Sequence, residues 1–179
     1  MFKKIASMAL VVGFLLGCIG VDPQGRGYSV AIPMDMINSK LTEQFPVQEE
    51  RSLGTVEISN PNVLGKQGSD KLGIGTSFKF TNFLLKDGIT GSLNLASGVR
   101  YDATSKNLYL TNPMVENLKF NDFSLAKYMT DGMKESLGII ISETIAKKPI
   151  YNISKLGMGS GFVNAIDIRD GQIYVTFGL

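Results

Sequence analysis

The longest helical pattern of hydrophobic and polar residues runs from Phe123 to Lys148. Its apolar residues recur at three- and four-residue steps, which places them on one face of an α-helix, and its charged residues lie opposite. Asp122 or Ser124 can cap the start, and Pro149 ends the pattern. The sequence therefore predicts one long amphipathic helix that must pack on a broad apolar partner. The apolar positions are Leu125, Met129, Met133, Leu137, Ile140, Ile141 and Ile145.

The centre and the end of the chain alternate apolar and polar residues instead, the pattern of a strand with one face in a core. The Asp87-Gly88 and Asp170-Gly171 pairs predict tight hairpin turns. Glycines inside the strands indicate bulges or bends, which curl a sheet. The strands predicted by this alternation cover residues 71–85, 89–101, 108–120, 163–169 and 172–177.

A shorter helix is predicted near the start of the folded region, where Pro33 opens a helical pattern and Pro46 closes it. No linker or low-complexity run divides residues 28–179, so we expect one domain there. The predicted fold class is α+β. It has one highly curved antiparallel sheet of five or six strands, wrapped on the long helix, plus the shorter N-terminal helix.

The first residues have the pattern of a secretion signal. Lys3 and Lys4 precede a short apolar run over residues 5–16. The run ends in Leu15-Leu16-Gly17-Cys18, which resembles the lipobox of bacterial lipoproteins. An ordinary signal peptide with an incidental cysteine, or an uncut anchor, is the alternative.

The lipobox resemblance implies a membrane anchor. Residues 1–17 would be removed as a lipoprotein signal peptide, Cys18 would carry the lipid, and residues 18–27 would include a short tether. Ile19 follows Cys18, in the place where an aspartate retains enteric lipoproteins in the inner membrane. We therefore expect the outer membrane, with the domain facing the periplasm.

Charge and composition exclude several classes of function. The 18 basic side chains include Lys3 and Lys4, so the chain without its signal carries 16 basic and 16 acidic side chains. A nucleic-acid-binding protein needs a basic excess or patch, and none is visible. The chain has no histidine and a single cysteine, which excludes Ser-His-Asp and Cys-His catalysis and the usual imidazole metal sites. We expect no enzyme, metal or cofactor.

Three local patterns, taken in order along the chain, are similar to the YceB-like bacterial lipoproteins, a family with a domain of unknown function. They are Tyr28-Ser29-Val30 leading into residues 37–41, Pro149 to Ile153 after the long helix, and the closing residues 166–177. The resemblance implies a fold like one half of the bactericidal permeability-increasing protein over residues 28–179. In the larger relatives of that tubular lipid-binding fold, an apolar groove between sheet and helix holds acyl chains.

The long helix and the central strands supply candidate residues for such a groove, although the same side chains could fill an ordinary core. Small and flexible residues on the helix would leave room against aromatic residues of the sheet. The candidates are Phe78, Phe80, Leu93, Leu95, Met129, Gly132, Met133, Ser136, Leu137 and Ile140.

The sequence thus favours a lipid-anchored envelope protein that binds a lipid or another apolar ligand in its groove. The alternative is a packed scaffold lipoprotein that binds another envelope protein. Expected partners are the membrane through Cys18, an apolar small molecule and an envelope protein, with no nucleic acid.

Overall fold

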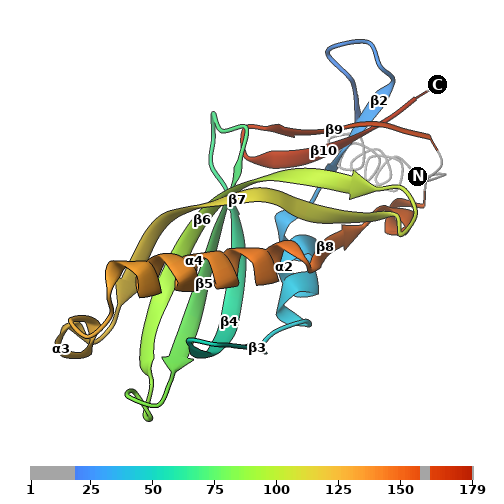
Figure 1. Cartoon of the computed structure of the whole chain (residues 1–179). Helices are drawn as coiled ribbons and strands as arrows, with labels where there is room; N and C mark the ends of the chain where they lie inside the picture. The colour runs from blue at the N-terminus through green and yellow to red at the C-terminus, as the bar shows by residue number, and fades with distance from the viewer. Residues whose placement is uncertain (1–18, 158–161, 179) are drawn as a thin grey trace, which may run out of the picture.

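The computed structural model describes residues 19–157 and 162–178, and Figure 1 shows the arrangement of their elements. Within these residues ten strands form two antiparallel sheets. The main sheet has the order β3 (Val47–Arg51), β4 (Gly54–Gly65), β5 (Leu72–Thr81), β6 (Ile89–Asp102), β7 (Asn107–Phe120) and β8 (Pro149–Asn152). The terminal sheet has the order β1 (Ile19–Val21), β2 (Tyr28–Ile32), β10 (Gln172–Phe177) and β9 (Val163–Arg169).

The helices are short. They are α2 (Met34–Thr42), α3 (Phe123–Ala126), α4 (Asp131–Ala146) and a 3-10 turn over Ile153–Leu156. Figure 1 shows α4 lying across the main sheet, whereas α2 lies beside β8. Both helices direct apolar side chains toward the strands.

The predicted α+β fold, with one sheet wrapped on a long helix, is wrong. The described residues are mostly strand, they form two sheets, and no long helix follows β7. The chain between Phe123 and Lys148 has two helix starts instead of one. Thr130 has extended backbone angles, and its Oγ1 accepts a hydrogen bond from the Met133 N–H at 3.3 Å, so Thr130 is an N-cap. Met129 lies in the connection between α3 and α4 and is buried. The apolar pattern therefore continues across the break although the helix does not.

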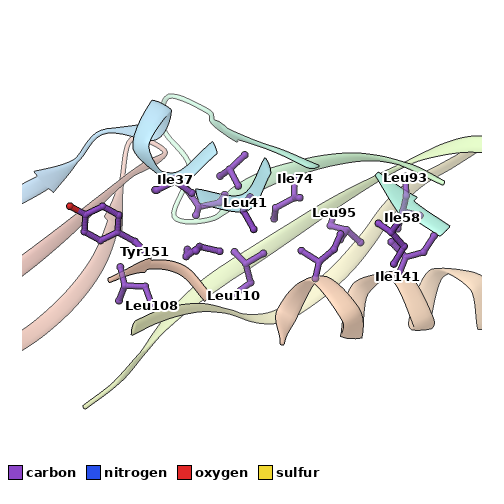
Figure 2. Close-up of a cluster of buried hydrophobic side chains, with 14 of the residues drawn as sticks. Ile37, Leu41, Ile58, Ile74, Leu93, Leu95, Leu108, Leu110, Ile141 and Tyr151 are labelled. Carbon is purple, nitrogen blue, oxygen red and sulfur yellow. The ribbon is translucent and has the colours of Figure 1, made fainter. Parts of the chain in front are cut away.

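The core joins the two helices to the main sheet. Figure 2 shows Ile37 and Leu41 of α2 and Ile141 of α4 in one cluster with side chains from the strands. All three are fully buried. The strand residues labelled in that view are Ile58, Ile74, Leu93, Leu95, Leu108, Leu110 and Tyr151.

The two sheets meet at the Asp170-Gly171 hairpin. The Gly171 N–H donates to the Ser69 carbonyl at 2.9 Å, and the Gly68 N–H donates to the Asp170 carboxylate at 3.1 Å. A Cβ at Gly171 would collide with the backbone of Gly65, so only glycine allows this approach. The hairpin turn therefore seats the terminal sheet on the turn between β4 and β5.

Candidate functional site

Most of the groove residues predicted from the sequence lie in the filled core. The side chains of Phe78, Phe80, Leu93, Leu95, Met129 and Leu137 are buried and belong to one hydrophobic cluster. Met133, Ser136 and Ile140 are half-buried, and Gly132 is exposed with open space around it. Eight of these ten positions thus belong to the hydrophobic core or pack against it, whereas Ser136 and Gly132 do not.

An open apolar cleft lies beside these residues, at the end of the main sheet. Its volume is about 590 Å³. We call it the end cleft; its lining residues are Ser92, Leu118, Lys119, Phe120, Asn121, Phe123 and Ala126.

Phe120 connects the end cleft to the predicted groove. Its ring packs edge-to-face on Phe78, with the ring centroids 5.7 Å apart. Both residues pair with Gly91 on β6, the strand between them. A Cβ at Gly91 would collide with the Phe78 ring, so the missing side chain gives the aromatic pair its space. The inner wall of the cleft is therefore continuous with the buried Phe78.

The sequence also explains why α3 forms the outer wall of the end cleft. The Asn121 N–H donates to the Thr90 carbonyl at 3.0 Å, which holds the end of β7 against β6. The Asp122 carboxylate then accepts hydrogen bonds from the Ser124 N–H at 2.8 Å and the Leu125 N–H at 3.3 Å. A hydrogen bond from the Ser124 hydroxyl, together with these two, holds the pKa of Asp122 below its usual range. The N-cap turns the chain from strand to helix and places Phe123 and Ala126 at the cleft.

A second, polar cleft of about 390 Å³ lies at the terminal sheet. The buried Asp22 carboxylate accepts hydrogen bonds from Arg26 Nε at 2.8 Å and Arg26 Nη2 at 3.1 Å, and Arg26 also pairs with Asp167 on β9. Arg26 therefore holds the pKa of Asp22 well below its usual range. Asp22, Arg26 and Asp167 pair with one another, so they fasten the β1–β2 hairpin to β9. Arg169 also lines this cleft; its Nη2 lies 3.9 Å from Asp22 Oδ1, and its buried Nε has no hydrogen-bond partner in the described part of the chain.

In the described part of the chain, no group of three or more His, Cys, Asp or Glu residues is placed to hold a metal ion. None of its helices is long and apolar enough to cross a membrane. Cys18, the predicted lipidation site, lies outside the described residues.

Residues 34–169, from the start of α2 to the end of β9, match the profile of a family described as "protein of unknown function (DUF1439)". The chain belongs to the DUF1439 family. No curated protein matches the chain. The region shared with DUF1439 contains the whole main sheet and the end cleft, whereas β1, β2 and β10 lie outside it. The family description assigns no activity, so function must be argued from the site.

The sequence did not single out the end cleft. Leu118 and Phe120 lie in the strand predicted over residues 108–120, but Phe123 and Ala126 belong to a segment interpreted as continuous helix. The Asp122 cap directly after a strand predicts a sharp turn at that point, but it does not indicate which elements meet there.

Proposed function

We propose that this DUF1439 protein is a lipid-anchored envelope protein of the YceB-like type, held in the outer membrane through Cys18. It faces the periplasm and binds the acyl chain of a lipid, or another apolar ligand, in the end cleft. The observation that carries the proposal is the open, mostly apolar cleft lined by Phe120, whose ring packs edge-to-face on the buried Phe78.

The size and lining of the end cleft suit an acyl chain. Ligand sites in proteins usually measure roughly 300–1,000 Å³ and are mostly apolar with a few polar groups. Leu118, Phe120 and Phe123 supply the apolar wall, and the exposed Lys119 can meet an anionic headgroup. Each buried methylene contributes about 0.8 kcal/mol, which partly offsets the loss of freedom on binding. A chain longer than the cleft would leave its remainder in solvent, so medium-length chains should bind best.

The test is mass spectrometry of an organic extract from the purified protein, with uptake of a fluorescent fatty acid as a second readout. Ala126→Phe would fill the cleft with an aromatic ring and should lower both bound lipid and uptake at least about tenfold. Ala103→Phe is the matched control, because Ala103 is exposed in the β6–β7 turn, away from the cleft. A wild-type chain with an empty extract and no uptake would contradict the proposal.

The alternative function is a scaffold lipoprotein that binds another envelope protein. It is favoured by Met114 and Val115 on β7 and Ile139 on α4, three large apolar side chains that are exposed on adjoining elements. Two results together would support this function instead. The organic extract of the wild-type protein would contain no lipid, and an envelope protein that cross-links to wild type would no longer cross-link to the Met114→Ser and Ile139→Ser variants.

A further inference from the structure

The end of the main sheet that carries the end cleft also presents large apolar side chains to solvent. Phe83 and Leu84, in the loop between β5 and β6, are 80% and 71% exposed. Phe123 of α3 and Tyr128 just after it are 86% and 62% exposed. In Figure 1 this loop and α3 both extend from the main sheet on the side away from β2, β9 and β10. We call these four side chains the apolar tip.

Hydrogen bonds from backbone N–H groups to the Asn82 side chain and to a backbone carbonyl hold the loop in the conformation that exposes its apolar residues. Asn82 Oδ1 accepts hydrogen bonds from the Leu84 N–H at 3.0 Å and the Leu85 N–H at 2.8 Å. The Gly88 N–H donates to the Leu85 carbonyl at 3.0 Å. Leu85 packs against the core, whereas Phe83 and Leu84 point away from it. Single exposed apolar residues are ordinary on protein surfaces. Four large apolar side chains on two neighbouring segments, the β5–β6 loop and the α3 segment, instead indicate an interaction surface.

The charges around the apolar tip identify the kind of partner. Lys86, Lys119 and Lys127 are exposed beside it, and Lys127 Nζ lies 5.1 Å from the centroid of the Tyr128 ring. Of the three neighbouring acids, Asp122 is occupied as the cap of α3, Asp131 pairs with Lys134 at 3.0 Å, and Asp87 is exposed. Lysines that flank aromatic and aliphatic side chains are typical of segments that lie in the headgroup region of a bilayer.

We propose that the apolar tip docks on the surface of a phospholipid bilayer that carries anionic headgroups. Phe83, Leu84, Phe123 and Tyr128 would enter the boundary between headgroups and acyl chains, and the three lysines would contact phosphates. Because Phe123 also lines the end cleft, docking brings the mouth of the cleft to the acyl chains. The use of docking for ligand entry rests on the proposed function, whereas docking itself does not.

Sedimentation with vesicles tests the docking. The full chain, as purified from the producing cell, is held in phosphatidylcholine nanodiscs, so that an anchor at Cys18 is already occupied. It is then mixed with sucrose-loaded vesicles containing roughly one-third phosphatidylglycerol. We expect Phe83→Ser with Leu84→Ser to lower the sedimented fraction at least about tenfold. We expect high salt to lower it as well. Val21→Ser with Leu64→Ser is the matched control, because Val21 and Leu64 are exposed apolar residues elsewhere in the chain.

Each outcome decides the proposal. Wild-type chain that stays in the supernatant, or a tip variant that sediments like wild type while its melting temperature is unchanged, overturns it. If the tip variant instead turns a dimer into a monomer, the tip is a contact between two copies and the bilayer proposal fails. Ala126→Phe, which blocks the cleft but leaves Phe83 and Leu84 intact, separates the two proposals. Vesicle binding without lipid uptake in wild type would remove the proposed function and keep the docking.

Discussion

Gly138 of α4 lies directly against Val115 of β7. A Cβ at Gly138 would come within 3.1 Å of Val115 Cγ2, which is closer than ordinary van der Waals contact. Gly138 is buried in the middle of the helix, where glycine is otherwise unfavourable. The absent side chain therefore sets how closely α4 approaches the main sheet.

Gly138→Leu should push α4 away from β7. Overpacking of this kind costs about 1–3 kcal/mol of unfolding free energy, which denaturant titration measures. Gly132→Ala is the control in the same helix, because no atom lies within 4 Å of the added Cβ. It should leave stability unchanged or raise it by up to about 1 kcal/mol. If both variants have the same stability, α4 does not depend on this contact.

Leu137→Lys should destabilise the protein strongly. Leu137 is buried against the core, so the lysine would leave an unpaired charge there, at a cost of roughly 3–5 kcal/mol. Ile139→Lys, two residues along the same helix, lies on the exposed side and should change stability by about 0.5 kcal/mol or less. Thermal unfolding of the two variants measures the difference. An unchanged melting temperature for Leu137→Lys would place this face of α4 in solvent.

Acid should weaken the attachment of the β1–β2 hairpin. Hydrogen bonds from Arg26 hold the pKa of the Asp22 carboxyl below its unfolded value of 3.8. Its ionised form therefore stabilises the fold at neutral pH, and this contribution is lost as the pH falls below about 4. Asp22→Asn should lower the denaturation midpoint at pH 7 and show a smaller further loss at pH 3 than wild type does. Glu116→Gln, an exposed change on β7, should follow wild type. If the denaturation midpoints of wild type and Asp22→Asn fall in parallel as the pH is lowered, the Asp22 carboxylate does not stabilise the fold in this way.

Cys18→Ser tests the anchor. The variant should lose metabolic labelling with a palmitate analogue and leave the membrane fraction, because Cys18 is the chain's only cysteine. Gel fluorescence and fractionation of cells measure both results. Labelling that persists in the variant would refute the lipobox assignment.

The parts of the fold that the sequence predicted well are those with one buried and one exposed face. β6, β7, β9 and β10 begin and end within one residue of the predicted strands, and both Asp-Gly pairs lie at turns between strands. Period-two alternation is visible there because each strand has a solvent side. Gly98, predicted at a bulge or bend, lies where the pairing of β6 and β7 shifts register.

The features that were not predicted from the sequence lack such an alternation. β3 pairs with β4 but has no buried residue, so its glutamates look like those of a loop. The break before α4 depends on the Thr130 cap, and a threonine inside an apolar periodicity is easily interpreted as mid-helix. The end cleft could not be predicted either, since Ser92, Phe120 and Ala126 come from three elements that meet only in the fold.

β1 begins at Ile19, one residue after Cys18, and pairs with β2 from its first residue. Residues 18–27, expected to include a short tether, therefore contain a strand of the domain. Under the proposed anchoring, the lipid on Cys18 would be attached directly next to β1, so the terminal sheet would lie close to the anchoring membrane. The folded domain would then set how far the apolar tip can reach from that membrane.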